Sequence, residues 1–428
     1  MKEFKYRWLW TWDWRMNWDL KGIEGPFHGG GDQYQKDKGS YLVDYKNLIK
    51  YMSEHGLNGV IIYGFIRDSH GGVEYAREFC KYGNERGVRI LPGVGTCYYE
   101  GYYYEGKHRY NMTTWLQEHP ELRAVDEDGK RVPCLCASKE RNQEWIGDGM
   151  KWLFESLEDL KGVNVESNEF FVCRCRDCKR RREEMKGDEP DYYKDMFTVI
   201  EPAVEAALEV CPDAWVSYAT YTGFERRMME SPPTFAKLLP EEAICQWSFS
   251  KPFLGHWPKG VRPPTRHNVA LGYLNYAKKT ERGFAGFSIS AIRGLCRRAA
   301  ESGMEGVIIY GEDPSTNVNN EINYLAFEEF SSHPKTSFEN FARRKLAELY
   351  GGEGPAEQIV SMALSSERGR RDVGTIKENL RLAKDALKDV KNPQARERWS
   401  QVVKRLEYDL QRTYGYPRVE EGTYKVYE

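Results

Sequence analysis

The stretch GVNVESNEFFVCRCRDC, residues 162–178, begins with the pattern of a strand and continues as a polar segment. Its first residues alternate valines with Asn164 and Glu166, which is the period-two pattern of a strand whose two faces differ. A second acid, Glu169, and three closely spaced cysteines follow. A buried strand that ends at a carboxylate is typical of a parallel barrel, in which catalytic groups follow the carboxyl ends of the strands. The alternative interpretation is a solvated strand end, where Glu and Ser are common.

The order of strand, polar loop and helix around this stretch recurs along the chain. Apolar runs predict further strands at residues 7–13, 59–65, 88–94, 215–221, 242–249 and 306–310, and at either 270–276 or 284–289. Because runs of helical spacing lie between many of them, these strands indicate parallel βαβ units. Eight strands that each lead into a polar loop predict a (β/α)8 TIM barrel. A doubly wound sheet is the alternative, but no glycine-rich phosphate fingerprint follows the first strand.

After the eighth predicted strand and the helix that follows it, the sequence predicts helices and no further strands. Helical spacing is clearest at residues 373–391 and 395–414. We therefore predict a barrel domain over residues 1–335 and a C-terminal helical region over residues 336–428, which we interpret as a packing appendage. The loop after the third strand, residues 95–142, is long, and long insertions in compact domains are usually functional or covering segments.

Composition narrows the classes of partner. The 428 residues carry a formal net charge of −2 without a basic block, so we expect no nucleic-acid partner and no binding to an anionic membrane surface. No window is apolar enough to span a bilayer, and the N-terminus lacks a signal-peptide pattern. These features predict a cytoplasmic protein, although a secreted chain trimmed of its leader would look the same. No cofactor is predicted, and the oligomeric state stays open, a homo-oligomer included.

Polar and aromatic residues follow the predicted strand ends and should converge on one mouth of the barrel. The candidate acids are Glu166, Glu312 and Glu169. The candidate substrate-binding residues are Trp12, Asp13, Arg15, Arg67, Asp68, His70, Tyr218 and Trp247. Recurrent acids suit acid/base chemistry, and aromatic rings suit stacking on the flat face of a sugar. Together they fit cleavage of a glycosidic bond, which requires one carboxyl group to protonate the leaving oxygen and another to attack or to activate water.

We assign the role of general acid to Glu166, with Glu312 as its partner and Glu169 as the reserve candidate. Two strands on opposite sides of a barrel would hold their carboxyl groups far apart. A separation of about 6.5–9.5 Å leaves room for water and implies inversion, whereas about 5 Å implies a covalent intermediate. The alternative function is a barrel that binds carbohydrate without cleaving it.

The cysteines form a second candidate group. Cys173, Cys175 and Cys178 lie in CRCRDC, and Cys134 and Cys136 lie earlier in CLC. Four of these thiolates, those of Cys136, Cys173, Cys175 and Cys178, are sufficient for a structural zinc site. Free buried thiols are the alternative, which the spacing CxCxxC favours because it is less diagnostic than paired CxxC knuckles. Either way we predict a structural cluster, since no base accompanies the thiols. No metal ion is predicted at the barrel mouth.

Several motifs resemble a largely uncharacterised group of barrel hydrolase-like proteins near the hexosaminidase and α-glucuronidase families. The resemblance covers most of residues 6–350 and rests on WTWDWRMNW, RDSHGG, HPELRAVDEDGK, CLCASKERNQEW, GVNVESNEFFVCRCRDC and NNEINYLAFEEFSSHPKTSFENFARR. It implies a TIM barrel and glycoside hydrolysis without fixing the sugar. The long loop after the third strand would wall off the mouth and favour exo action on oligosaccharides or glycoconjugates.

Two neighbouring families differ from this sequence at their catalytic positions. Asn168-Glu169 resembles the Asn-Glu of the large retaining glycosidase clan, but that clan places its nucleophile after strand seven, where this chain offers no convincing acid. Hexosaminidases that use the acetamido group of the substrate carry an adjacent Asp-Glu pair after strand four. Here two residues separate Glu166 from Glu169, which argues against that mechanism.

Overall fold

The structure of the chain is a computed structural model, which describes residues 3–12, 38–95, 103–166, 171–185, 191–219, 240–248, 260, 262–263, 265–273, 287–310, 318–368 and 372–415. Eight parallel strands close into a barrel in the order β1-β10-β9-β8-β7-β6-β3-β2. Their bounds are β1 Tyr6–Trp12, β2 Gly59–Tyr63, β3 Arg89–Gly95, β6 Gly162–Glu166, β7 Trp215–Ala219, β8 Ile244–Ser248, β9 His267–Tyr273 and β10 Gly306–Tyr310. The predicted (β/α)8 fold is confirmed, and the first alternative for the seventh strand is the correct one.

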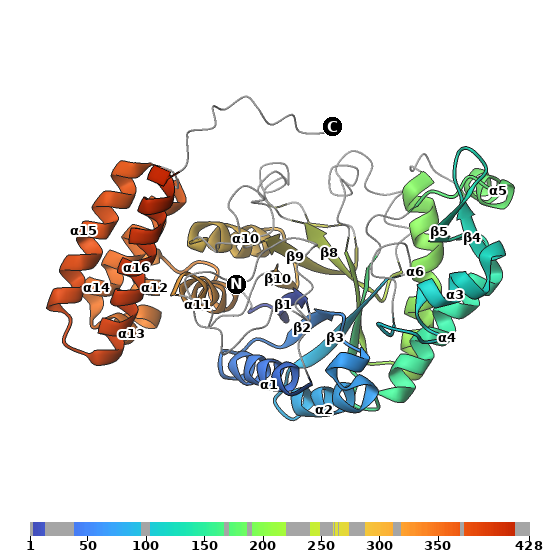
Figure 1. The fold of residues 1–428 in the computed structure, drawn as a ribbon, viewed down its shortest axis with the longest axis horizontal. Helices are drawn as coiled ribbons and strands as arrows, with labels where there is room; N and C mark the ends of the chain where they lie inside the picture. Colours follow the sequence, from blue (N-terminus) through green and yellow to red (C-terminus); the bar gives the residue numbers. More distant parts are fainter. Residues whose placement is uncertain are drawn as a thin grey trace.

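Helices lie outside the barrel (Figure 1). Those of the barrel half are α1 Lys38–Glu54, η1 Asp68–His70, α2 Gly72–Asn84, α3 Met112–Glu118, η2 Pro120–Leu122, α4 Glu140–Ser156, α5 Arg176–Glu184, α6 Asp191–Val210, α10 Ile289–Glu301 and α11 Val318–Ser332. The long segment between β3 and β6 also contains an antiparallel ribbon of β4 Arg123–Val125 and β5 Arg131–Leu135. Figure 1 shows this ribbon together with α3 and α5 at one edge of the molecule.

The strands are two-sided, as the alternation in β6 predicts. Val163 and Val165 belong to the large apolar cluster that packs the barrel against its helices. Asn164 lies between them in sequence and hydrogen-bonds to residues of β2, β7 and β8 across the barrel interior. Because successive residues of a strand face opposite sides, the even-numbered positions of β6 face the interior.

Aromatic side chains fill the interior of the barrel, and glycines make room for them. The interior cluster consists of Tyr6, Trp8, Trp10, Ile61, Tyr63, Leu91, Ile244, Val269, Leu271, Ile308 and Tyr310. A Cβ added to Gly59 would lie 2.5 Å from the Trp8 ring, and one added to Gly93 would lie 2.6 Å from the Tyr63 ring. Large rings opposite missing side chains interdigitate at the density of a protein core. The five aromatic residues of this cluster therefore serve as core packing.

The C-terminal helices form a bundle beside the last helices of the barrel (Figure 1). They are α12 Phe338–Phe341, the π-helical turn η4 Ala342–Leu346, α13 Ala347–Tyr350, α14 Glu353–Arg368, α15 Val373–Asp389 and α16 Pro393–Gly415. Arg398 of α16 pairs with Glu321 of α11 at 2.8 Å, and Glu367 of α14 accepts a hydrogen bond from the backbone N–H of Ser290 in α10. These polar contacts join the helical appendage to the barrel. The boundary between residues 335 and 336 remains our proposal.

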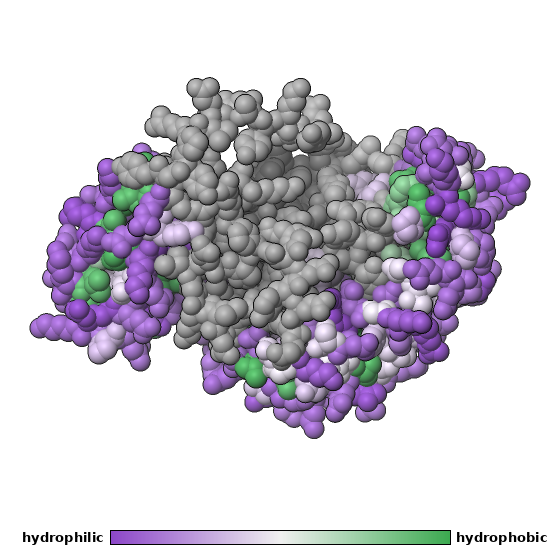
Figure 2. All heavy atoms as spheres, viewed as in Figure 1, coloured by the Kyte–Doolittle hydropathy of each residue, from purple (hydrophilic) through white to green (hydrophobic). Residues whose placement is uncertain are grey.

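The outer helices present mostly charged and polar side chains to the exterior. On the face that Figure 2 shows, the described residues are predominantly hydrophilic, and apolar residues appear only in places among them. Among the described residues, no helix combines the length and the apolar character that crossing a membrane requires.

Candidate active site at the barrel mouth

Glu166 is the last residue of β6 and occupies an inward register position. Gly95 of β3 pairs with it, just as Gly93 pairs with Asn164 two residues earlier. Since Asn164 lies inside the barrel, alternation places position 166 on the same inward face, one step nearer the carboxyl end of the strand. In a parallel barrel this end is the mouth where catalytic groups gather.

A buried polar network lies directly below this position. The Asn164 amide donates to the Tyr63 hydroxyl at 2.6 Å, and its carbonyl oxygen accepts from the Ser217 hydroxyl at 2.8 Å and from the Gln246 amide. Gln246 also donates to Ser217 at 3.1 Å. All four residues are at most 2% exposed. Polar groups that satisfy one another in a dry interior fix one geometry, so this network holds β2, β6, β7 and β8 in register beneath the mouth.

Trp12 ends β1 on the same inward face. Register pairs it with Tyr63, and the two ring centroids lie 5.1 Å apart at an interplanar angle of 37°. The Tyr45 hydroxyl of α1 donates to the Trp12 carbonyl at 2.9 Å and so fixes the end of the strand. The indole remains partly exposed at the mouth, which suits stacking on the face of a sugar ring.

Arg67, in the turn after β2, forms an ion pair with Glu105, an acid that is not among the candidates predicted from the sequence. The Glu105 backbone N–H donates to the Ile66 carbonyl at 2.8 Å, and its carboxylate lies 4.0 Å from the Arg67 guanidinium. Burial raises the pKa of Glu105 above its ordinary value, and the Arg67 charge offsets this only in part. A carboxyl group that keeps its proton to higher pH is suited to acid catalysis. Glu105 could not be predicted because it lies in the long loop after β3, where the alternation of residues along a strand does not determine the position of a side chain.

Asp68 and His70 are held by neighbouring elements. Asp68 accepts a hydrogen bond from the Tyr104 hydroxyl. Burial is the main cause that raises the pKa of Tyr104 to about 12, and the hydrogen bond to the Asp68 carboxylate raises it further. His70 is 2% exposed, and its ring stacks on Tyr41 of α1 at 3.9 Å and 11°. His70 is therefore a core residue of this turn, and its burial corrects its predicted contact with sugar hydroxyls. The predicted contacts of Arg67 and Asp68 with sugar hydroxyls stay predictions.

Tyr218 and Trp247 lie on the other face of their strands, which corrects their predicted role in stacking on substrate. Both side chains are 0% exposed and pack in the layer between barrel and helices. The Trp247 indole donates to the Asn268 side chain at 2.7 Å. The inward residues of these strands are their neighbours Ser217 and Gln246, so the prediction for Tyr218 and Trp247 was wrong about the face of the strand.

Four further candidates, Asp13, Arg15, Glu169 and Glu312, lie outside the described residues. Their predicted roles stay predictions.

Among the described residues, the side chains with the spacing of a metal site are Cys136, Cys173, Cys175 and Cys178. They lie at the β4–β5 ribbon and α5, at the edge of the molecule rather than at the inward strand positions (Figure 1). The cysteine cluster is therefore not part of the barrel mouth.

Comparison with known proteins gives a fold but no family. No protein-family model matches the chain, and no curated protein matches its sequence. The chain is similar to a solved GH138 enzyme targeting pectin rhamnogalacturonan II, with 8% identity, a TM-score of 0.57, and coverage of 97% of this chain and 71% of that one. It is also similar to a Vibrio harveyi GH20 exo-β-N-acetylglucosaminidase, with 11% identity, a TM-score of 0.46, and coverage of 76% of this chain and 54% of that one. At 8% identity, the likeness to the GH138 enzyme shows a shared fold and nothing finer.

Proposed function

We propose that this chain is a glycoside hydrolase in which Glu166 acts as the general acid. The observation that carries the proposal is the inward register position of Glu166 at the carboxyl end of β6, above the buried network of Asn164. Barrel enzymes place their catalytic groups at this face, and a carboxyl group there is suited to protonating a leaving oxygen. The fold likeness to glycoside hydrolases supports the class by analogy only.

Glu312 is the proposed partner of Glu166, and it follows β10 by two residues. In the closed barrel three strands separate β6 from β10 in either direction, so these two strands lie opposite each other. Carboxyl groups that reach into the mouth from opposite strands would leave room for a water molecule between base and sugar. We therefore propose an inverting mechanism, in which Glu312 activates the water. Glu169 remains the reserve acid. Glu105 is an additional candidate, and it contacts the turn after β2, a strand two places from β6 in the barrel.

The proposed substrate is a carbohydrate that binds through the sugar at the end of its own saccharide chain. Trp12 offers a partly exposed indole at the mouth for stacking, and Arg67 offers a guanidinium for hydroxyl contacts. The loop after β3 contacts the turn after β2 through Glu105 and Tyr104, so it borders this side of the mouth. A mouth bordered by such a loop suits exo action on oligosaccharides or glycoconjugates.

The test is hydrolysis of a panel of aryl glycosides by the wild type and by Glu166→Gln. A matched control is Glu118→Gln, which changes an exposed acid on α3. We expect the wild type to turn over at least one glycoside, Glu166→Gln to lose about 10²–10⁴-fold in rate while still binding the sugar, and the control to match the wild type. Full activity of Glu166→Gln would overturn the assignment. Binding of sugars without turnover of any glycoside by the wild type would support the non-hydrolytic alternative instead.

A further inference from the structure

We propose that Cys136, Cys173, Cys175 and Cys178 bind one Zn²⁺ ion that anchors the segment following β6. The Sγ atoms of all four residues lie within 4.8 Å of one another. Cys136 Sγ lies 3.5 Å from Cys178 Sγ, 3.6 Å from Cys173 Sγ and 3.7 Å from Cys175 Sγ. Tetrahedral zinc with Zn–S bonds of about 2.3 Å sets sulfur–sulfur separations of about 3.8 Å. The sulfur geometry therefore matches a tetrahedral thiolate site.

The separations do not fit the alternatives to a single ion. A disulfide requires sulfur atoms about 2.05 Å apart, and each of the three measured separations is far longer. A multi-iron cluster inserts its own sulfides between the cysteines and would spread the four Sγ atoms over a wider cavity. Free thiols would not need to converge, yet Cys136 meets three sulfur atoms from residues 37 to 42 positions away in the chain.

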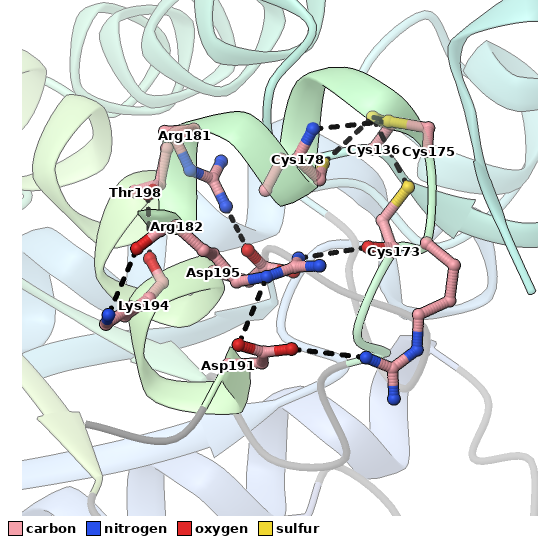
Figure 3. Close-up of polar contacts among 12 residues, drawn as sticks. Cys136, Cys173, Cys175, Cys178, Arg181, Arg182, Asp191, Lys194, Asp195 and Thr198 are labelled. Atoms are coloured by element: carbon pink, nitrogen blue, oxygen red, sulfur yellow. Dashed lines mark hydrogen bonds and ion pairs between the residues drawn. The ribbon is translucent and has the colours of Figure 1, made fainter. Parts of the chain in front are cut away.

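The ligands come from two separate parts of the chain (Figure 3). Cys136 directly follows β5, whereas Cys173 and Cys175 precede α5 and Cys178 lies in its first turn. Cys136, Cys173 and Cys178 are at most 1% exposed, and Cys175 is half-buried. Three ligands are thus shielded from solvent, while the fourth leaves a route by which an ion can enter.

The surroundings suit the charge of such a site. Four thiolates and Zn²⁺ carry a net charge of −2, which needs hydrogen-bond donors and cations nearby. The backbone N–H of Val125 donates to Cys173 Sγ at 3.3 Å, and the backbone N–H of Cys178 donates to Cys175 Sγ at 3.4 Å. The buried Arg182 guanidinium donates to the Cys173 carbonyl at 2.9 Å (Figure 3). Contacts of this kind orient metal ligands and stabilise their thiolate form.

The consequence for the barrel is a cross-link between the β4–β5 ribbon and the segment after β6. Cys173 lies seven residues after Glu166, so the ion would fix the far end of the segment that leaves the proposed catalytic position. The effect on catalysis rests on the proposed function, whereas the presence of the ion does not. Metal content and glycosidase activity are therefore measured separately.

The experiment is elemental analysis of the full chain purified without a metal-affinity step. We expect about one zinc per chain in the wild type and loss of most of it in Cys178→Ser. The matched control is Cys134→Ser, which changes a cysteine that is 3% exposed in the same apolar cluster but outside the quartet. We expect this control to keep about one zinc per chain. Equal loss from both variants would overturn the ligand assignment, and iron in place of zinc would overturn the choice of metal.

A second measurement covers the case in which Cys178→Ser does not fold. Wild-type protein is stripped with a chelator and reloaded with Co²⁺, whose visible spectrum reports tetrahedral thiolate coordination. We expect stripping to lower the melting temperature, and we expect Co²⁺ to restore it with thiolate-to-metal absorption. Failure of zinc-free protein to take up Zn²⁺ or Co²⁺, with an unchanged melting temperature, would overturn the proposal. Activity plays no part in either readout, so failure of the glycosidase proposal would be recognised independently.

Discussion

Replacing Asn164 by Ala should destabilise the barrel strongly, because this side chain joins three buried partners. The substitution leaves the Tyr63 hydroxyl, the Ser217 hydroxyl and the Gln246 amide each short of one hydrogen bond. An unsatisfied buried group costs about 1–3 kcal/mol, which gives roughly 3–9 kcal/mol for three. Ser217 and Gln246 still bond to each other, and a water molecule can enter the space left by the amide. We therefore expect a loss of about 3–5 kcal/mol.

The assay is urea unfolding, with the exposed Asn340→Ala of α12 as the matched control. We expect the control to stay within about 0.5 kcal/mol of the wild type. Adding Ser217→Ala to Asn164→Ala should cost less than the sum of the two single changes, because each removes a partner of the other. A loss below about 1 kcal/mol for Asn164→Ala, close to that of the control, would refute the argument that the network fixes the strands in register.

Three further predictions test the packing, the electrostatics and the appendage. Gly93→Ala should lower the free energy of unfolding by about 1–3 kcal/mol, because the added methyl group overpacks against the Tyr63 ring. Gly294→Ala on α10 places its methyl group in open space and should raise the free energy of unfolding by about 0.5–1 kcal/mol. Equal effects of the two changes in urea unfolding would contradict the packing described for the barrel interior. The pKa of Glu105 is raised in the folded state, so the folded protein binds this proton more tightly than the unfolded chain does. The free energy of unfolding should therefore fall as the pH rises above 4.5 and through the folded pKa, and Glu105→Gln should abolish that fall. A wild-type stability that rises relative to the variant over this pH range would contradict the prediction. Arg398→Ala should loosen the helical appendage from α11 and speed its proteolysis relative to Arg396→Ala, because the Arg396 guanidinium donates to the Val390 carbonyl between α15 and α16 rather than to a residue of α11. Identical cleavage rates would rule out the Arg398–Glu321 pair as a docking interaction.

The barrel was predictable because burial imposes a simple period on its strands. Val163 and Val165 alternate with residues of the opposite face, and this alternation alone places Asn164 and Glu166 on one side of β6. The choice between residues 270–276 and 284–289 for the seventh strand was not decidable in this way, since both runs are apolar. Pairing with β8 and β10 selects the first of them.

The site was less predictable because strand ends do not reveal which face a residue takes. Tyr218 and Trp247 stand near strand ends in sequence, yet each lies one position from an inward residue and packs against helices. Glu105 approaches β2 only because the loop after β3 folds back on the turn after β2. The zinc alternative named Cys136 with Cys173, Cys175 and Cys178, and the structure brings these four side chains together.

The role of Glu166 as general acid is tested most directly by comparing substrates with different leaving groups in the Glu166→Gln variant. A general acid matters most when the leaving oxygen is a poor leaving group and least when the aglycone is activated. We expect Glu166→Gln to lose about 10²–10⁴-fold in kcat/KM on an alkyl glycoside and far less on a dinitrophenyl glycoside of the same sugar. Equal losses on both substrates, or this pattern in Glu169→Gln while Glu166→Gln remains fully active, would contradict it.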